Sequence, residues 1–267
     1  MKPEQISIGE TFVNTIDVGS GPVILLVHGF PLSHQMWKFQ IETLSDRYRV
    51  IAPDLPGFGS SPVSQTPMSM QGLADTLAVM LDSMGVAEPV AYCGLSMGGY
   101  VGWQFWKHHR QRLSHLIACD TRAACDTEQV HRARQIAAHS VMQTGAATVA
   151  DSMVQKLFHD PDSERKQSIV GEVHQVISQT SPASIAAGQL AMADRPDATD
   201  WISEIEVPTL FVVGEFDEIT TPQEMRANAS LVPGSKFLQV ADAGHMAPLE
   251  NPVEFNHGLH GFLDRQI

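Results

Sequence analysis

Continuously apolar runs alternate with segments of helical periodicity in the first 120 residues of the chain. Residues 22–27 read Pro-Val-Ile-Leu-Leu-Val, and an unbroken apolar run is typical of a parallel strand that is buried on both faces. Between residues 33 and 46 the apolar positions recur at helical spacing, and residues 48–52 form a second apolar run. This order predicts one βαβ unit.

The same alternation continues on both sides of a long central interruption. It predicts further helices over residues 69–84, 97–108, 222–231 and 252–264, and further strands over residues 89–93, 113–119, 207–213 and 236–240. Residues 6–18 alternate apolar and polar positions, which predicts one antiparallel strand near the start. The pattern predicts the α/β fold class, with a mostly parallel, twisted sheet and helices on both faces.

Residues 121–205 interrupt the alternation of strands and helices. Apolar residues within this segment recur at helical spacing, and Asp126 with Gln129 resembles a capping box at the start of a helix. We therefore expect an all-helical insertion over residues 121–205. It separates two parts of one core domain, residues 1–120 and residues 206–267.

The chain is strongly acidic. Thirty Asp and Glu against seventeen Lys and Arg give a formal net charge of −13. Such a field opposes binding to nucleic acid or to an anionic membrane, so a neutral or weakly polar small molecule is the expected partner. Residues 1–5 lack the apolar run of a signal peptide, and no stretch reaches the about 18 apolar residues of a membrane span, so we expect a cytoplasmic protein. The oligomeric state stays open.

The cysteines and histidines show no spacing typical of a metal site. The three cysteines form no C-x-x-C pair, and the twelve histidines show no H-E-x-x-H or Cys/His ligand pattern. Cys93 and Cys119 lie in apolar, strand-like runs, where a thiol behaves as a small hydrophobic side chain. We expect no metal and no cofactor.

Residues 94–99, Gly-Leu-Ser-Met-Gly-Gly, lie between a predicted strand and a predicted helix. A serine at the apex of such a tight turn is held in a strained conformation, and Gly94 and Gly98 supply neighbours without a Cβ atom. The turn exposes the Ser96 hydroxyl above the sheet edge and aims the first helix amides at whatever it attacks. This pattern is the G-x-S-x-G nucleophile elbow. The alternative is a glycine-rich turn with a solvated serine, because so short a motif also occurs by chance.

A serine nucleophile needs a base, and the base needs a group that orients it. Asp217 follows the predicted strand 207–213, and His245 follows the predicted strand 236–240. Both side chains therefore belong to loops at the carboxyl ends of parallel strands, on the same edge as Ser96. Open α/β sheets place their ligand sites at this edge.

These motifs resemble those of the α/β-hydrolase superfamily over nearly the whole chain. The order Ser96, Asp217, His245 is the order of that fold. The resemblance implies an α/β-hydrolase fold with a helical cap, or lid, formed by residues 121–205. The other matching motifs are His28-Gly29, the loop Asp-Leu-Pro-Gly-Phe-Gly-Ser-Ser at residues 54–61, and Gly244-His245.

A catalytic triad is implied by the same resemblance. His245 takes the Ser96 proton during attack and later returns it to the leaving group, while Asp217 fixes the histidine tautomer and stabilises the imidazolium. The backbone amides of Met97 and Phe30 are the expected oxyanion donors. The Phe30 side chain is expected to form part of the pocket wall.

Other polar residues compete for these roles. Asp120 ends the strand before the insertion, where some members of the superfamily carry the acid, and it is the alternative to Asp217. We expect Glu215 at the surface or behind the triad, His28 as a hydrogen-bonding residue of the oxyanion loop, and Asp242 as a residue that shapes its loop.

Within the superfamily the chain resembles the group of 3-oxoadipate enol-lactonases, small carboxylesterases and cofactor-free haloperoxidase-like perhydrolases. Residues 28–33, 94–99 and 120–127 carry this resemblance. Ser96 argues against haloalkane dehalogenases and epoxide hydrolases, whose nucleophile is an aspartate. Pro31 is the local sign of perhydrolysis, because peroxide-using relatives carry proline after the oxyanion residue.

The sequence therefore predicts a serine hydrolase that cleaves a small carboxylic ester or lactone through an acyl-serine intermediate. Perhydrolysis by the same triad is one alternative. Another is a small-molecule receptor with slow turnover, since some members of the superfamily keep a triad yet mainly bind and signal.

Overall fold

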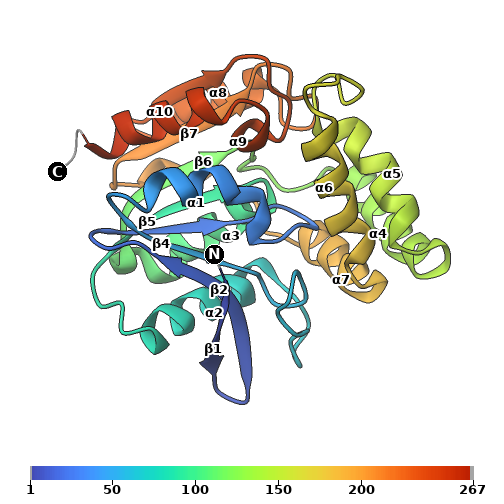
Figure 1. The fold of residues 1–267 in the computed structure, drawn as a ribbon, viewed down its shortest axis with the longest axis horizontal. Helices are drawn as coiled ribbons and strands as arrows, with labels where there is room; N and C mark the ends of the chain where they lie inside the picture. Colours follow the sequence, from blue (N-terminus) through green and yellow to red (C-terminus); the bar gives the residue numbers. More distant parts are fainter. Residues whose placement is uncertain (1, 265–267) are drawn as a thin grey trace.

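The computed structural model describes residues 2–264, and Figure 1 shows a twisted sheet with helices on both sides of it. The strand order is β1-β2-β4-β3-β5-β6-β7-β8. β1 pairs with β2, and β2 with β4, in the antiparallel sense, while the other neighbours are parallel. The predicted α/β class is confirmed. The strands are β1 (Glu4–Ile8), β2 (Thr11–Val18), β3 (Val23–Val27), β4 (Arg49–Pro53), β5 (Val90–Leu95), β6 (Leu113–Cys119), β7 (Thr209–Gly214) and β8 (Lys236–Val240).

Helices cover both faces of the sheet. Their buried side chains place α1, α9 and α10 on one face and α2, α3 and α8 on the other. The helices of the core are α1 (Lys38–Leu44), α2 (Met70–Ser83), α3 (Met97–His109), α8 (Pro222–Leu231), α9 (Ala247–Glu250) and α10 (Pro252–Leu263). Short 3-10 turns are η1 (His34–Trp37), η2 (Arg110–Arg112) and η3 (Ile202–Glu204).

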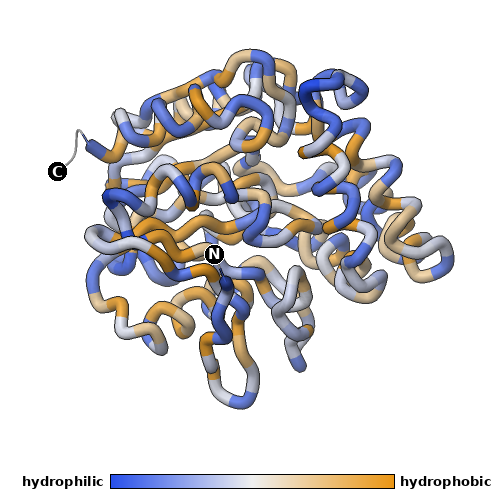
Figure 2. Tube along the Cα trace, in the orientation of Figure 1, coloured by the Kyte–Doolittle hydropathy of each residue, from blue (hydrophilic) through white to orange (hydrophobic). Residues whose placement is uncertain are grey.

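The apolar run of β3 is buried on both faces, as its sequence predicts. Leu25 and Val27 belong to the cluster that includes α2 and α3, whereas Ile24 and Leu26 belong to the cluster that includes α1 and α10. Successive side chains of a strand point to opposite faces, so both faces of β3 require apolar residues. Figure 2 shows hydrophobic segments concentrated in the sheet.

The prediction of a single strand over residues 6–18 is wrong. The segment forms two strands, β1 and β2, which pair as a hairpin with Ile8 opposite Thr11. Gly9, between them, has a φ of 61°, a left-handed conformation that glycine adopts without steric cost. A two-residue turn thus reverses the chain at a point where the apolar and polar positions of the sequence continue to alternate.

Four α-helices lie between β6 and β7 and gather beyond one end of the sheet (Figure 1). α4 packs on α7, and α5 packs on α6. The helical content agrees with the expected insertion, while its limits at residues 121 and 205 stay a prediction. These helices are α4 (Glu128–Thr144), α5 (Ala146–Leu157), α6 (Gln167–Gln179) and α7 (Pro182–Ala193).

The capping-box prediction for α4 is wrong by one residue. Thr127, rather than Asp126, caps the helix, because its Oγ1 accepts a hydrogen bond from the amide of Val130. The Asp126 carboxylate is buried between two guanidinium groups: Nε of Arg134 donates to it at 2.6 Å, and a terminal nitrogen of Arg195 lies 2.8 Å away. Charged donors bind a carboxylate more strongly than a backbone amide does. The Asp126 carboxylate therefore pairs with the two arginines and does not cap the helix.

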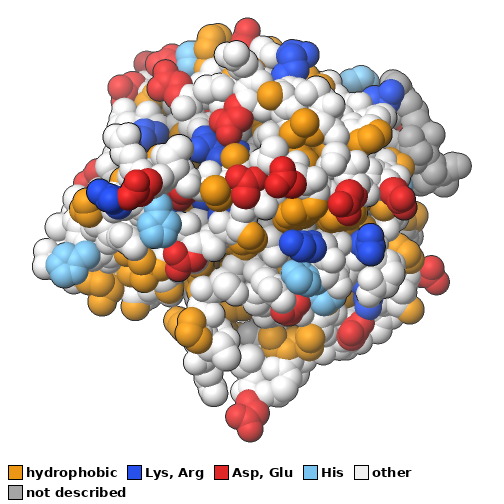
Figure 3. Space-filling model, turned by 180° about the vertical axis from the view of Figure 1, so that it is seen from behind, with side chains coloured by type: hydrophobic (Ala, Val, Ile, Leu, Met, Phe, Trp, Pro, Cys, Tyr) orange, Lys and Arg blue, Asp and Glu red, His pale blue; other side chains and the backbone are white. Residues whose placement is uncertain are grey.

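Acidic side chains are scattered among fewer basic ones on the face that Figure 3 shows. Several basic side chains are paired, as Arg49 is with Asp17 and Arg112 is with Asp82. Among the residues that the structure describes, no helix has both the length and the hydrophobicity needed to cross a bilayer.

Candidate active site

The turn between β5 and α3 holds Ser96 in a strained conformation. Its φ is 54° and its ψ is −112°, a region that residues with side chains rarely adopt. A Cβ atom at Gly94 would lie 2.3 Å from the carbonyl oxygen of Gly98, and one at Gly98 would lie 2.3 Å from that of Val27. Close approach of backbone to backbone therefore requires glycine at both positions.

Ser96 is the one residue between positions 90 and 106 that is not fully buried. Its amide donates a hydrogen bond to the carbonyl of Cys119 at 2.8 Å, and its carbonyl accepts one from Thr121 Oγ1 at 2.8 Å. The end of β6 thus holds the turn against the sheet while the serine stays partly exposed.

The carboxyl ends of β7 and β8 bring Asp217 and His245 together. Nδ1 of His245 lies 2.8 Å from Oδ2 of Asp217, and both side chains are buried. Oδ1 of Asp217 accepts hydrogen bonds from the amides of Ile219 at 2.8 Å and Thr220 at 3.0 Å. A carboxylate can only accept, so the proton of the first contact belongs to Nδ1. This leaves Nε2 of the neutral ring as a proton acceptor.

The surroundings of Asp217 favour its ionised form. Burial by itself would raise the pKa of this carboxyl. The charge and hydrogen bond of His245, together with the amides of Thr220 and Ile219, outweigh burial and bring the pKa of Asp217 below its ordinary value. Asp217 is therefore negatively charged at neutral pH, as a group that stabilises an imidazolium must be.

Asp120, the alternative acid, occupies a different position. It follows β6, is fully buried, and accepts a hydrogen bond on Oδ1 from the amide of Gly214 at 2.9 Å. Among residues 2–264, the carboxylate that hydrogen-bonds to the imidazole of His245 is that of Asp217.

His28 joins the loop after β3 to the loop after β4. Its Nε2 accepts a hydrogen bond from the amide of Leu55 at 2.9 Å, so the proton lies on Nδ1, which donates to the carbonyl of Gly29 at 2.8 Å. Burial lowers the pKa of His28 to about 4, although the nearby Asp54 acts in the opposite direction. Both ring nitrogens are occupied, so His28 is a structural residue of this loop rather than a base.

The loop after β3 lies directly beside the elbow. A Cβ atom at Gly29 would lie 3.5 Å from the Cβ of Ser96, so the residue before Phe30 packs next to the serine. The amide of Met97 is the first of α3, where helix amides have no partner within the helix. In the part of the chain that the structure describes, neither amide donates a hydrogen bond to another backbone group.

The side chain of Phe30 contacts both the core and the helical insertion. Its ring packs edge to face on Phe58, with centroids 6.0 Å apart. A Cβ atom at Gly188 in α7 would lie 2.7 Å from the Phe30 ring and 3.1 Å from the Phe58 ring. α7 therefore packs directly on both rings. The peptide bond between Phe30 and Pro31 is cis, and Thr180 Oγ1 donates to the carbonyl of Pro31 at 3.3 Å.

Ser96 and the Asp217–His245 pair share the same edge of the sheet, but no hydrogen bond between Ser96 and His245 occurs among the described residues. β6 and β7 separate the strand that carries the serine from the strand that precedes the histidine. The structure thus joins Asp217 to His245 by a hydrogen bond and places Ser96 at the same edge of the sheet.

Glu215 and Asp242 lie at the surface. The amide of Asp242 donates to Oε2 of Glu215 at 3.2 Å, and the Asp242 carboxylate pairs with Arg165 at 3.1 Å. Both residues shape the loops after β7 and β8. Neither hydrogen-bonds to the histidine of the site within the described residues.

The polar cluster that holds the loop of His245 has no signature in the sequence. Glu250 accepts hydrogen bonds from the amides of Gly244 at 2.8 Å and His159 at 2.9 Å, and from Nζ of Lys166 at 2.9 Å. Lys166 belongs to the helical insertion and is only 4% exposed. A lysine that follows Asp, Ser, Glu and Arg indicates a solvated segment, so a buried ion pair here was not predicted.

One group of possible metal ligands occurs among residues 2–264. It consists of Asp120, Asp217 and His245, whose ligating atoms lie within 4.8 Å of one another. Oδ1 of each carboxylate already accepts a backbone amide, and Oδ2 of Asp217 accepts the imidazole proton. These three carboxylate oxygens and Nδ1 of His245 are thus engaged in hydrogen bonds within the protein.

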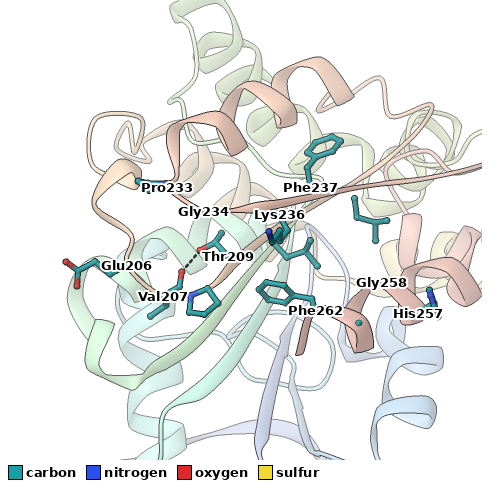
Figure 4. A pocket seen from close by; sticks show the side chains of 14 residues that line it. Glu206, Val207, Thr209, Pro233, Gly234, Lys236, Phe237, His257, Gly258 and Phe262 are labelled. Atoms are coloured by element: carbon teal, nitrogen blue, oxygen red, sulfur yellow. Dashed lines mark hydrogen bonds between the residues drawn. The ribbon is translucent and has the colours of Figure 1, made fainter. Parts of the chain in front are cut away.

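Two sizeable cavities occur in the structure, one far from this group and one beside it. One of about 500 Å³ surrounds the amino ends of β7 and β8, at the opposite edge of the sheet, and is lined by Thr209, Lys236 and Phe262 among others (Figure 4). Another of about 590 Å³ borders Asp217, between the helical insertion and the loop after β7.

Known proteins resemble the chain over nearly its full length. The family model described as alpha/beta hydrolase fold matches residues 22–252. The solved structure of a thermophilic esterase from Thermogutta terrifontis, with malate bound, superposes with a TM-score of 0.94 at 37% sequence identity. The match covers 100% of this chain and 99% of the esterase.

Two lactonases are also similar. The curated protein 3-oxoadipate enol-lactonase 2 from Acinetobacter baylyi is 26% identical over 244 residues, which are 91% of this chain and 89% of the relative. An enol-lactonase structure from Burkholderia xenovorans shares the fold, with a TM-score of 0.90 at 24% identity, covering 98% of this chain and 100% of that one. Because the family model matches most of the chain and the sheet has the matching architecture, the chain belongs to the alpha/beta hydrolase family.

Proposed function

We propose that this protein is a serine hydrolase that cleaves a small carboxylic ester or lactone through an acyl intermediate on Ser96. The observation that carries the proposal is the hydrogen-bonded pair of Asp217 and His245 at the sheet edge where the strained elbow presents Ser96. An oriented imidazole and a serine at a helix N-terminus are the parts that acyl transfer needs. The names of two relatives, an esterase and an enol-lactonase, fit this class of reaction.

In the proposed reaction Nε2 of His245 takes the Ser96 proton as Oγ attacks the carbonyl carbon. The amides of Met97 and Phe30 donate hydrogen bonds to the oxyanion of the tetrahedral intermediate. His245 then protonates the leaving oxygen. Water, activated by the same imidazole, releases the acid from Ser96. The hydrogen bond between Ser96 and His245 forms in the substrate complex, where catalytic hydrogen bonds commonly tighten.

We assign residues 121–205 the role of a cap over this site. α7 packs on the rings of Phe30 and Phe58 beside the elbow, so a cap helix and two aromatic rings bound the space next to Ser96. Such walls support an apolar acyl group of limited size. The negative charge of the chain disfavours strongly anionic substrates.

Steady-state hydrolysis of graded p-nitrophenyl esters and simple lactones tests the proposal. We expect Ser96→Ala to lower kcat by about 10⁴-fold or more, because the attacking oxygen is lost. The matched control is Ser83→Ala, which replaces an exposed serine at the end of α2 and should retain wild-type kinetics. Wild-type turnover by Ser96→Ala, or no turnover of any of these substrates by folded wild-type protein, would contradict the proposal.

Pro31 favours a second reaction at the same site, in which hydrogen peroxide replaces water as the acyl acceptor. Pro31 directly follows Phe30, whose amide is the proposed oxyanion donor. A parallel series with added peroxide should then form peracid, and Pro31→Ala should reduce peracid formation more than ester hydrolysis. Equal loss of both activities would leave hydrolysis as the supported reaction.

A further inference from the structure

A second carboxyl group lies in the candidate site without a part in the proposed reaction. Asp120 is fully buried, and its Oδ2 has no hydrogen-bond partner among the described residues. Its ligating oxygen lies within 4.8 Å of those atoms of Asp217 and His245. The φ of Asp120 is 47°, and such strain persists where surrounding structure imposes it, often at functional sites.

Two buried carboxyl groups this close together are not both ionised, because like charges at short range in a low dielectric repel strongly. The proton resides on the group whose anion is less stabilised. Asp217 accepts three hydrogen bonds, from two backbone amides and from Nδ1 of His245, whereas Asp120 accepts one, from the amide of Gly214. Donors stabilise an anion, so the negative charge belongs to Asp217 and the proton to Asp120.

The titratable groups around Asp120 agree with this assignment. Burial, and then the Asp217 carboxylate, raise the pKa of Asp120 well above its ordinary value, and Glu250 on α9 adds to the effect. Cys119, the neighbour of Asp120 at the end of β6, is a neutral thiol, because burial raises its pKa. Lys166 is paired with Glu250.

We propose that Asp120 is a positioning residue that stays protonated at neutral pH and directs its Oδ2 proton at the Asp217 carboxylate, a role that rests on the proposed function of the triad. The hydrogen bond restrains the carboxylate that orients His245. A neutral Asp120 also leaves one negative charge, rather than two, beside the imidazole. A second negative charge there would disfavour the neutral imidazole that the proposed reaction needs as its base.

Two substitutions of Asp120 test the proposal through the pH profile. Asp120→Asn keeps the shape, the acceptor for Gly214 and a donor, without a charge. It should keep kcat within about threefold of wild type and the acidic limb of kcat/KM within about 0.3 pH unit. Asp120→Ala loses the donor and should lower kcat about tenfold with little change in KM. A purely structural role would lower the melting temperature of both variants without this separation of kcat from KM.

An ionised Asp120 in the wild-type protein would give a different profile. Asp120→Asn would then remove a negative charge beside the imidazole and move the acidic limb of kcat/KM to lower pH by about one unit or more. That shift would overturn the proposal.

Infrared difference spectroscopy gives a readout that does not depend on activity. At neutral pH the wild-type spectrum should contain the C=O stretch of a buried protonated carboxyl group that Asp120→Asn lacks. Absence of this difference, with Ser96-dependent turnover intact, would overturn the inference and leave the proposed function standing. If the band is present but turnover does not depend on Ser96, Asp120 is protonated as proposed, and its role in positioning a triad is overturned.

Discussion

Three glycines set the geometry around Ser96, each through one close approach. Gly94 and Gly98 allow the elbow to pack on backbone carbonyls, and Gly188 allows α7 to reach the rings of Phe30 and Phe58. A methyl group at any of these positions would occupy space already filled by backbone or ring atoms. The geometry of the site therefore requires glycine at these three positions, in addition to the reactive side chains.

Gly98→Ala should disrupt the elbow. The added Cβ would lie 2.3 Å from the carbonyl oxygen of Val27, and backbone cannot yield as a flexible side chain does. We expect a loss of about 2–4 kcal/mol in the free energy of unfolding and strongly reduced ester hydrolysis. Urea unfolding and steady-state kinetics measure both.

The matched control is Gly171→Ala, a helical glycine of α6 whose added Cβ meets no atom within 4 Å. It should stabilise the protein by up to about 1 kcal/mol, because alanine favours the helix. Equal effects of the two substitutions on stability and ester hydrolysis would show that close packing at the elbow does not cause the loss in Gly98→Ala.

At the scale of secondary-structure elements, the buried ion pair of Lys166 and Glu250 connects the helical insertion to the loop of His245. Lys166 precedes α6, and Glu250 ends α9, where it also accepts the amide of Gly244. Burial raises the pKa of Glu250 above its ordinary value although Lys166 acts in the opposite direction. The pair therefore holds a segment of the helical insertion and the residue before His245 in one arrangement.

Lys166→Met should destabilise the protein by about 3–5 kcal/mol at neutral pH, because it leaves the Glu250 charge buried without its partner. Without Lys166 the pKa of Glu250 rises further, so the folded form takes up a proton more readily than the unfolded chain. The stability of the variant should accordingly recover as the pH falls. Urea unfolding at several pH values measures this.

Arg165→Met is the control, since Arg165 pairs with Asp242 at the surface. Exposed pairs contribute little, so a change below about 1 kcal/mol is expected. A neutral outcome for Lys166→Met at every pH would show that the buried pair does not anchor the insertion.

At the scale of the whole molecule, two buried polar residues, His28 and Asp54, make the free energy of unfolding sensitive to acid. His28 and Asp54 lie in the loops after β3 and β4, where Asp54 accepts hydrogen bonds from His34 at 2.7 Å and Asn14 at 2.8 Å. Burial would raise the pKa of Asp54, but the hydrogen bond and charge of His34 lead the contributions that lower it to about 2. Burial lowers the pKa of His28 from 6.5 to about 4.

The free energy of unfolding should fall as the pH decreases from 6.5 to 4. In this range His28 binds a proton in the unfolded chain but not in the folded protein, so acid favours unfolding. The difference in pKa corresponds to about 3 kcal/mol for His28. Asp54 adds a further loss below its ordinary pKa, toward about 2.

Urea unfolding across this pH range tests the effect in wild type and His28→Asn. The slope of stability with pH between 6.5 and 4 should be shallower in His28→Asn, whatever its absolute stability. His108→Asn, at an exposed position at the end of α3, should leave the slope as in wild type. Identical slopes for all three proteins would contradict the assignment to His28.

Features that depend on neighbouring residues were predictable from the sequence. The unbroken apolar run of β3 and the two glycines around Ser96 meet requirements set within a few residues of chain. The edge that carries Asp217 and His245 was also predictable, because the carboxyl ends of parallel strands share one side of a sheet. The hairpin of β1 and β2 was missed, since a tight turn at Gly9 interrupts the alternation very little.

The sequence by itself thus determined the α/β architecture, the elbow and the loops on which the candidate acid and base lie, because periodicity and turn chemistry are local properties. Only the tertiary structure decided that Asp217 rather than Asp120 hydrogen-bonds to His245, that Lys166 is buried against Glu250, and that α7 packs on Phe30. These outcomes depend on distance, burial and charge among residues that are far apart along the chain. Those quantities exist only once the chain has folded.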